Sequence, residues 1–256
     1  MTRTLVVFGD IHCPIEDRKL VRSFISFMKD YQPDELVCIG DLMDLNQPSR
    51  WAKDTKAEFE GSVFLDAKHT RERVLEPLRE VYDGPFGFIC GNHDSRGTDY
   101  LRRFAPALGE STAFDPDVLL DFPSLDITTL QPFYEFHRDW VMTHGHLGGI
   151  RLTHEAGRTA LNASVKFQKN VVHGHTHRLG ATSKSFGYGS EVHKVFTGVE
   201  TGHMIDMRLA GYLKQSTANW QSGFCVIHID GGHVTPQTIP VSDGKFTVDG
   251  QTYKVR

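Results

Sequence analysis

Thiols are scarce in this chain of 256 residues, and they lie far apart in the sequence. The four cysteines are Cys13, Cys38, Cys90 and Cys225. No two of them have the short spacing of a structural zinc site or a dithiol redox motif. We interpret them as reduced thiols, most of them packed in the core, and find no indication of an oxidising compartment.

Long hydrophobic runs are also missing. No apolar run approaches the roughly 20 residues that span a bilayer. An apolar, strand-like run already starts at Leu5, which leaves no room for a signal peptide. We therefore expect a cytoplasmic protein that does not associate with a membrane.

The chain also lacks an excess of positive charge. Lysine and arginine total 28 against 32 acidic residues, a formal net charge of −4. This balance argues against a protein that mainly coats nucleic acid, so we expect no stable nucleic-acid complex. The apolar share of 39% is ordinary for a globular chain. The length suits one large domain with a sizeable core, and we predict a single domain over residues 1–256.

Short apolar runs alternate with helical patterns, which indicates an α/β fold. Residues 20–28 place their apolar side chains on one helical face, and Pro33 ends that helix. A longer helical pattern runs from about Thr55 to Tyr82, with Phe59 on its apolar face. Pro77 lies inside this pattern, where we expect a kink or a break. A third helix is predicted around residues 154–167.

Seven apolar runs are typical of buried strands. They cover residues 5–8, 36–39, 86–90, 140–142, 170–172, 192–196 and 224–229. A hairpin is expected at residues 230–232, where two glycines follow an aspartate. Residues 110–138 read as an irregular insertion with a short helix. The Gly-, Ser- and Thr-rich residues 180–222 read as a loop that borders the site, and we expect residues 180–256 to border the substrate.

Five of these runs end in residues that bind metals or transfer protons. The clusters are Asp10-Ile11-His12, Asp41-Leu42-Met43-Asp44, Asn92-His93-Asp94, His144-Gly145-His146 and His173-Gly174-His175-Thr176-His177. In α/β folds ligands bind beyond the carboxyl ends of strands, so five strand ends would project these clusters towards one place. The chain has 14 histidines, and several of them are concentrated in these clusters.

The residue types in these clusters favour a metal centre. Aspartate, asparagine and histidine offer oxygen and imidazole nitrogen without thiolate, which suits first-row divalent ions. Manganese is our first expectation, with iron, zinc, cobalt or nickel as alternatives. Seven or eight such groups are too many for one tetrahedral site, but they suit two ions that share a carboxylate.

The five ordered clusters resemble those of the calcineurin-like metallophosphoesterases, in particular their small phosphodiesterase branch. The resemblance spans Gly9 to His177, and five clusters in the right order are far more specific than any one of them. It implies an α/β fold built as a four-layer α/β/β/α sandwich, in which two mixed β-sheets are flanked by helices.

The resemblance also implies roles for particular residues. One ion would be held by Asp10, His12, Asp41 and His177, and the other by Asp41, Asn92, His144 and His175. Asp41 would bridge the two ions, a bridging hydroxide would be the nucleophile, and His93 would protonate the leaving oxygen. Either Asp94 or Asp44 would orient His93.

Four functions remain open at this point. We favour a phosphodiesterase for cyclic nucleotides or other small phosphodiesters, because two divalent ions, two carboxylates and a hydroxide leave a charge of about +1. The alternatives are a phosphomonoesterase or phosphoprotein phosphatase, a nuclease acting on DNA or RNA ends, and a scaffold without catalysis. The complete set of implied ligands disfavours the scaffold.

Several residues receive a purely structural interpretation. We expect His146 to lie just outside the ligand set and His173 to face the core, and we assign no site role to His203. Tyr188 and Trp220 could stack on a base, but packing is their more common use. The sequence identifies no substrate-binding residue, no native metal pair and no oligomeric state.

Overall fold

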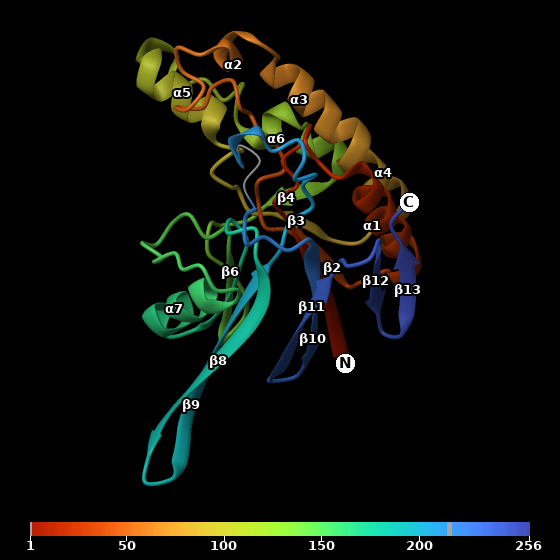
Figure 1. The fold of residues 1–256 in the computed structure, drawn as a ribbon, viewed down its shortest axis with the longest axis vertical. Coiled ribbons are helices and arrows are strands. Elements are labelled where there is room, and N and C mark those ends of the chain that lie inside the picture. The colour runs from red at the N-terminus through yellow and green to blue at the C-terminus, as the bar shows by residue number, and fades with distance from the viewer. Residues whose placement is uncertain (1, 214–216) are drawn as a thin grey trace.

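The computed structural model describes residues 2–213 and 217–256 and contains two large mixed β-sheets between helices (Figure 1). The first sheet has the order β11-β10-β1-β2-β3-β4. Its parallel strands are β1 (Thr2–Phe8), β2 (Glu35–Cys38), β3 (Phe86–Phe88) and β4 (Ile127–Thr129). The antiparallel strands β10 (Gly223–Asp230) and β11 (His233–Pro240) form the predicted hairpin.

The second sheet has the order β5-β6-β7-β9-β8. Its parallel strands are β6 (Trp140–Thr143), β7 (Asn170–His173) and β9 (Glu191–Thr201). The antiparallel edge strands are β5 (Tyr134–His137) and β8 (Leu179–Tyr188). Each of the seven predicted strands is present, with shifted bounds.

Alternate residues of the central strands pack into different cores, which explains the layers. Val6 and Phe8 of β1 pack towards the helices on the outer face of the first sheet. Leu5 and Val7 point the other way, into a core shared with the second sheet. This period of two follows from the pleat of a strand, and it places the two sheets face to face.

The second sheet repeats this arrangement on its own outer face. Val172 of β7 lies in the core between the sheets, whereas its neighbour Val171 packs with Ala163 of α7 (Arg158–Phe167). The order of layers is therefore helix, sheet, sheet, helix, which confirms the predicted four-layer α/β/β/α sandwich.

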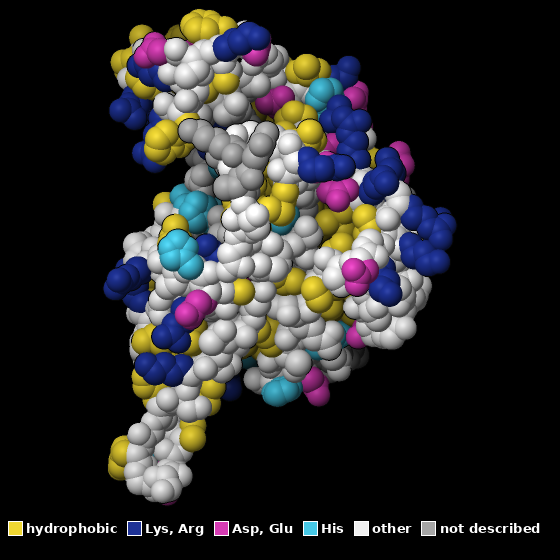
Figure 2. Space-filling model, in the orientation of Figure 1, with side chains coloured by type: hydrophobic (Ala, Val, Ile, Leu, Met, Phe, Trp, Pro, Cys, Tyr) yellow, Lys and Arg dark blue, Asp and Glu magenta, His cyan; other side chains and the backbone are white. Residues whose placement is uncertain are grey.

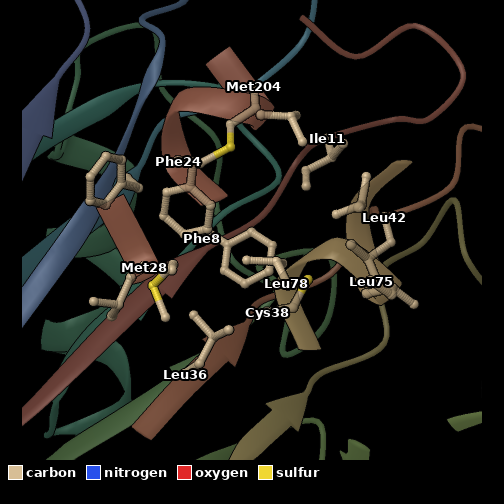
Figure 3. Packing of buried hydrophobic residues seen from close by; sticks show 14 of the residues in the cluster. Phe8, Ile11, Phe24, Met28, Leu36, Cys38, Leu42, Leu75, Leu78 and Met204 are labelled. Atoms are coloured by element: carbon tan, nitrogen blue, oxygen red, sulfur yellow. The ribbon is translucent and has the colours of Figure 1, made fainter. Parts of the chain in front are cut away.

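Helix α1 (Arg18–Tyr31) covers the first sheet, and Figure 3 shows its side chains against those of β1 and β2. The Asp17 carboxylate caps the helix by accepting hydrogen bonds from the N–H groups of Lys19 and Leu20. Gln32 takes a left-handed conformation just before Pro33, so the helix ends where the sequence predicts.

The long helical pattern at residues 55–82 is divided into four parts. These are α2 (Lys56–Phe59), α3 (Val63–Thr70), a π-helical turn η1 (Arg71–Leu75) and α4 (Glu76–Val81). Pro77 stands at the start of α4, where its missing N–H and its ring disturb the preceding turn, so the helix has a π-helical turn there but is not interrupted between Val63 and Val81. Phe59, expected on the buried face, is exposed because the chain is interrupted after it at Gly61, which has a φ of +89°.

Residues 110–138 are more regular than predicted. They contain α6 (Pro116–Leu119) and the 3₁₀ turn η3 (Phe122–Leu125), and they supply β4 and β5 to the two sheets. The short helix that the sequence predicts is present as α6, but the segment is not an irregular insertion, because its two strands belong to the sheets. Strands of three or four residues at sheet edges bury too few side chains to leave a clear apolar period.

The expectation of a loop over residues 180–222 was also wrong in its first half. β8 and β9 form a hairpin that extends away from the rest of the molecule (Figure 1). Most side chains of its outer part are exposed, so the sequence shows little apolar alternation there.

Smaller elements complete the fold. They are α5 (Arg96–Phe104), the 3₁₀ turns η2 (Pro106–Leu108) and η4 (Gly211–Leu213), and the hairpin β12 (Lys245–Val248) and β13 (Gln251–Lys254). Phe246 and Tyr253 of this hairpin pack against Phe27 of α1. Across the described ranges, no helix is both long and apolar enough to cross a membrane.

Candidate metal centre

The five polar clusters meet at the carboxyl ends of β1, β2, β3, β6 and β7, where the turns after these strands come together. The outline of the molecule is indented between its upper end and its body, and histidines line this indentation (Figure 2). The turns adopt an uncommon backbone. Asp10, His12, Asp41, His175 and His177 all have φ between +50° and +66°. Left-handed conformations in residues other than glycine are costly and gather at functional sites.

The first group of ligand atoms comes from β1 and β7. The Nε2 atoms of His12 and His177 lie 3.1 Å apart, and Asp10 Oδ1 is 3.3 Å from His177 Nε2 and 3.8 Å from His12 Nε2. The three side chains are buried. The Asp10 carboxylate also accepts a hydrogen bond from the N–H of His175, which ties the ends of the two strands together.

The second group comes from β2, β3, β6 and β7. His144 Nε2 lies 3.2 Å from Asp41 Oδ2 and 3.1 Å from Asn92 Oδ1. His175 completes the group, since one ligand atom each of Asp41, His144 and His175 lie within 4.8 Å of one another.

Asp41 connects the two groups. Its Oδ2 atom lies 3.5 Å from His12 Nε2 in the first group as well as 3.2 Å from His144 Nε2 in the second. The other carboxylate oxygen, Oδ1, accepts a hydrogen bond of 2.8 Å from the N–H of His93. One oxygen is thus held by the backbone while the other faces both groups.

Two of the histidines have their Nδ1 atoms engaged, which directs Nε2 into the site. His12 Nδ1 is 3.0 Å from Asp44 Oδ1, and His144 Nδ1 is 2.9 Å from the carbonyl oxygen of Ile39. Both partners are acceptors, so Nδ1 carries a proton and Nε2 is the nitrogen that can bind a metal. Such partners commonly fix the tautomer and orientation of histidine ligands.

His93 lies at the edge of this centre and is oriented by Asp44. Its Nδ1 atom is 3.1 Å from Asp44 Oδ1 and 3.0 Å from the Asp44 carbonyl oxygen. On the other side of the ring, Arg96 Nη2 is 2.9 Å from His93 Nε2, and Arg96 Nη1 donates to the Asp44 carbonyl oxygen.

Asp94, the alternative partner of His93, has a different place. Its buried carboxylate accepts hydrogen bonds from the N–H groups of Asp41, Met43 and Gly91. It therefore holds the turn after β2 against the turn after β3. Of the two residues left open by the sequence, Asp44 is the one that contacts the His93 ring.

Glycines allow the turns to approach this closely. A Cβ atom on Gly91 would lie 2.1 Å from Asp41 Oδ1, and one on Gly174 would lie 2.5 Å from Asp10 Oδ2. Both distances are far below a normal contact, so a side chain at either position would displace a carboxylate of the centre.

The electrostatics of the centre favour a cation. Burial raises the pKa of the Asp10 carboxyl, but hydrogen bonds with His12 and His177 outweigh burial and hold the pKa well below its ordinary value. Asp41 behaves in the same way through the charges of His144 and His93. Two ionised, buried carboxylates thus face the imidazoles, an arrangement that is normally balanced by bound positive charge.

The imidazoles respond to these carboxylates. Burial lowers the pKa of His12, but interactions with Asp10 and Asp44 raise it to about 10. The pKa of His144 rises to about 9, because the charge of Asp41 outweighs burial. Without a metal these histidines take up protons in place of the missing cation, and metal binding would release those protons.

Sequence reasoning missed two neighbours of this centre. The buried His203 has its ring centroid 5.8 Å from that of His177, and Trp220 packs edge-on against His177 at 4.2 Å. Both come from the return of the chain towards β10, far from any metal-binding cluster in the sequence. His173 is buried, as predicted. The partly buried His146 lies beside His144 and His175, and it belongs to none of the groups of candidate ligands among the described residues, in agreement with the expectation that it lies just outside the ligand set.

Comparison with known proteins gives a consistent picture. The sequence model of the calcineurin-like phosphoesterase family matches residues 3–179. The chain is 46% identical over 256 residues to the Gene 54 proteins of Mycobacterium phage L5 and Mycobacterium phage D29, covering 100% of each chain.

The solved structures that resemble this chain share less of its sequence than the phage proteins do. Vps29 from Chaetomium thermophilum is 14% identical with a TM-score of 0.47, covering 99% of this chain and 98% of that one. The nuclease MPE from Pseudomonas putida is 12% identical with a TM-score of 0.36, covering 91% and 87%. The family match includes more than half of the chain and all five polar clusters. The protein therefore belongs to the calcineurin-like phosphoesterase family.

Proposed function

We propose that this family member is a dinuclear metal-dependent phosphodiesterase. The observation that carries the proposal is the position of Asp41 Oδ2, within 3.5 Å of His12 Nε2 and 3.2 Å of His144 Nε2. A single oxygen that faces two separate groups of nitrogen and oxygen ligands suits a carboxylate shared by two ions.

The residues present fit such a pair of ions. Asp10, His12, Asp41 and His177 would hold one ion, and Asp41, Asn92, His144 and His175 would hold the other. The close approach of the Nε2 atoms of His12 and His177 supports this assignment, because two imidazole lone pairs directed at one point repel each other unless a cation or a proton lies between them. When bound, two divalent ions orient the phosphate, activate water and stabilise the charge that develops during displacement.

The donor set also supports a choice of metal. Carboxylate and amide oxygens together with imidazoles, without thiolate, suit manganese, and iron, zinc, cobalt and nickel follow as alternatives. We propose manganese as the first metal to test.

His93 is proposed as the proton donor to the leaving oxygen. Asp44 holds the Nδ1 side of the ring, which leaves Nε2 to deliver the proton. Arg96 Nη2 donates to this same Nε2, so the nitrogen can carry a proton only after Arg96 has turned away. A phosphate at the centre would attract the guanidinium, and in this way substrate binding would prepare His93 for proton transfer.

We propose a phosphodiester substrate, with cyclic nucleotides and other small nucleotide diesters as the first candidates. Two carboxylates beside two divalent ions and a hydroxide leave a charge of about +1, which matches the single negative charge of a diester better than the two charges of a monoester. Hydrolysis of phosphomonoesters is the alternative that the experiment must separate from this proposal.

The test compares a diester with a monoester on the protein loaded with Mn²⁺. We expect faster hydrolysis of bis-p-nitrophenyl phosphate than of p-nitrophenyl phosphate. Asp41→Ala should abolish metal-dependent turnover, since it removes the shared ligand. His93→Ala should lower kcat for the diester about 10²- to 10⁴-fold, the usual range for a lost general acid.

Two exposed residues provide matched controls. Asp139→Ala and His233→Ala remove the same side chains far from the centre and should leave turnover unchanged. A preference for the monoester would replace the phosphodiesterase with a phosphatase. Absence of turnover on both substrates, with two ions bound per chain, would contradict catalysis altogether.

A further inference from the structure

A cavity of about 370 Å³ opens directly beside the metal centre, between the segment that precedes α2 and helix α5. We call it the Trp51 cavity. It shares Asn92 and Arg96 with the centre. Three arginines, Arg50, Arg96 and Arg103, line it together with one carboxylate, Asp99, and the aromatic rings of Trp51, Tyr100 and Phe104. Its size lies within the range of small-molecule sites.

The aromatic rings of this cavity are exposed and paired with cations. Trp51 is 73% exposed, and the guanidinium of Arg50 lies 4.6 Å from the centroid of its ring. Phe104 is 39% exposed, with Lys53 Nζ at 3.9 Å and the guanidinium of Arg103 at 5.3 Å from its ring. Yellow and dark blue side chains lie next to each other at this upper end of the molecule in Figure 2.

This combination is typical of a surface that binds a nucleic-acid strand. A large exposed ring gains nothing by facing water, but it offers a flat face on which any base can stack. The neighbouring guanidinium and ammonium groups attract the phosphates between the bases. An acidic peptide would pair with the cations, but it carries no flat bases to stack on the exposed rings.

A second cavity on the other side of Trp51 has the opposite character. It measures about 450 Å³ and is lined by Asp44, Asp66, Leu209 and further polar and small residues. Among its described lining residues there are two carboxylates and no lysine or arginine. A polyanion would therefore be repelled on this side and would approach the centre through the Trp51 cavity.

Arg96 connects the Trp51 cavity to the site of the reaction. It lines the cavity and also contacts His93 and Asp44 at the edge of the centre. A phosphodiester held at the two groups of ligands would thus have the adjoining nucleotide within reach of Trp51 and Phe104.

We infer that the Trp51 cavity binds the nucleotide next to the cleaved phosphate of a single-stranded polynucleotide. Its base stacks on Trp51 or Phe104, and its flanking phosphates meet Arg50 and Arg103. The inference rests on the proposed phosphodiesterase activity, and it assigns to that activity a single-stranded polynucleotide in place of a small diester. The net charge of −4 is compatible with it, because the cations are local and a strand held by a few contacts is a substrate that dissociates.

Binding is measured first, without turnover. The protein loaded with Mn²⁺ is titrated into a fluorescein-labelled (dT)₈ with phosphorothioate linkages, and the anisotropy is recorded while the oligomer remains intact on a gel. We expect Trp51→Leu to weaken binding about tenfold, the order of one stacked base. Arg103→Gln should weaken binding and reduce the slope of log K against log salt by about 0.7.

Matched controls lie on the distant hairpin and at an exposed turn. Tyr188→Leu removes an aromatic ring that is 80% exposed, and Arg138→Gln removes an exposed guanidinium, so both should bind the oligomer like the wild type. An abasic octamer should bind the wild type at least tenfold more weakly than (dT)₈ and should not distinguish Trp51→Leu from the wild type. Unchanged metal content and melting temperature would show that the Trp51 variant is folded.

Turnover is measured second. Trp51→Leu should raise KM for a phosphodiester octamer by at least tenfold more than it raises KM for bis-p-nitrophenyl phosphate. Equal binding by Trp51→Leu and Tyr188→Leu would overturn the inference. The inference would also be overturned if the wild type bound the abasic octamer as tightly as (dT)₈, or if thymidine monophosphate competed as well as unlabelled (dT)₈. Tighter binding of a phosphoserine peptide than of (dT)₈ would overturn it as well. Failure of all hydrolysis would contradict the proposed function alone, since the anisotropy experiment does not depend on it.

Discussion

At the scale of the residue, buried carboxylates behave differently in the centre and in its surroundings. The carboxylates of Asp10 and Asp41 stay ionised because imidazoles face them. Asp66, a short distance away in α3, is also buried, but its described side-chain partner is the neutral amide of Gln47. Burial and the charge of Asp44 raise the pKa of Asp66 to about 6.

This raised pKa makes stability depend on pH. Between about pH 4 and pH 6 the folded protein holds a proton on Asp66 that the unfolded chain has lost, so stability falls as the pH rises through this window. Above pH 6 the folded protein carries the unfavourable charge. We predict that Asp66→Asn raises the free energy of unfolding at pH 8 by about 1–2 kcal/mol, allowing for partial screening by water.

Urea denaturation at pH 4 and pH 8 checks this prediction. The gain of Asp66→Asn should be clear at pH 8 and should be small at pH 4, because there the folded wild type is protonated at Asp66 and the unfolded chain is close to half protonated. Glu72→Gln removes an exposed carboxylate nearby and should show no such difference between the two pH values. A loss of stability at pH 8 would mean that the Asp66 charge is favourably paired.

At this scale the sequence located the polar residues of the centre better than their partners. Asp10, His12 and His177 each follow a strand within a short cluster, and the family resemblance grouped them. The choice between Asp44 and Asp94 was open, because both stand three residues or fewer from a ligand or proton donor. Only the folded chain shows Asp44 against the ring of His93 and Asp94 against three backbone N–H groups.

At the scale of the element, β8 and β9 differ along their length. The root of β9 is buried against α7 and β7, whereas the outer residues of the hairpin are exposed, with Val192 at 65%. Phe186 and Phe196 mark the boundary, because their rings are in contact and Phe196 is buried.

We predict that the tip of this hairpin is dispensable for folding and turnover. Replacing Gly187–His193 by Asn-Gly would join Phe186 to Lys194, which already pair across the strands, through a favoured two-residue turn. The melting temperature should change by less than about 2 °C, since exposed residues contribute little to stability. Differential scanning calorimetry and hydrolysis of bis-p-nitrophenyl phosphate give the two readouts.

A substitution at the root of the same strand provides the contrast. Phe196→Ala should lower the free energy of unfolding by about 3–5 kcal/mol, the usual effect of removing a buried phenylalanine. If the shortened hairpin lost as much stability as Phe196→Ala, the tip would have a packing role that its exposure does not show.

At the scale of the whole molecule, five turns from two sheets form one centre. Their buried carboxylates and imidazoles converge only in the folded chain, so a metal that binds there binds the folded state alone. The metal and the tertiary structure should therefore stabilise each other.

We predict that removing the metal with EDTA lowers the melting temperature by about 5–10 °C. Binding at one hundred times Kd contributes about 2.7 kcal/mol, and each kcal/mol corresponds to about 2–4 °C in a chain near this size. Calorimetry before and after dialysis with Mn²⁺ measures the shift. Asp41→Asn should show no shift, and an unchanged melting temperature in a wild type that contains two ions would contradict the prediction.

The sequence by itself determined the parts of this protein that are local. Each strand, the turn after it and the polar residues of that turn lie within about ten residues, so apolar patterns and cluster spacing indicated the sheets, the order of the clusters and the ligand types. The π-helical turn before Pro77 is local in the same sense, since it follows from one ring and one missing N–H.

Only the tertiary structure decided what depends on distant segments. The place of Asp41 Oδ2 between two groups of ligands, the approach of His203 and Trp220 to His177, and the Trp51 cavity beside Arg96 all join residues that are far apart along the chain. β8, and with it the hairpin that it forms with β9, was missed for a related reason, because none of the β8 residues is fully buried and the strand is held mainly by backbone pairing with β9. Long-range packing and pairing leave no periodic signal in the sequence, and here they shape the surroundings of the centre.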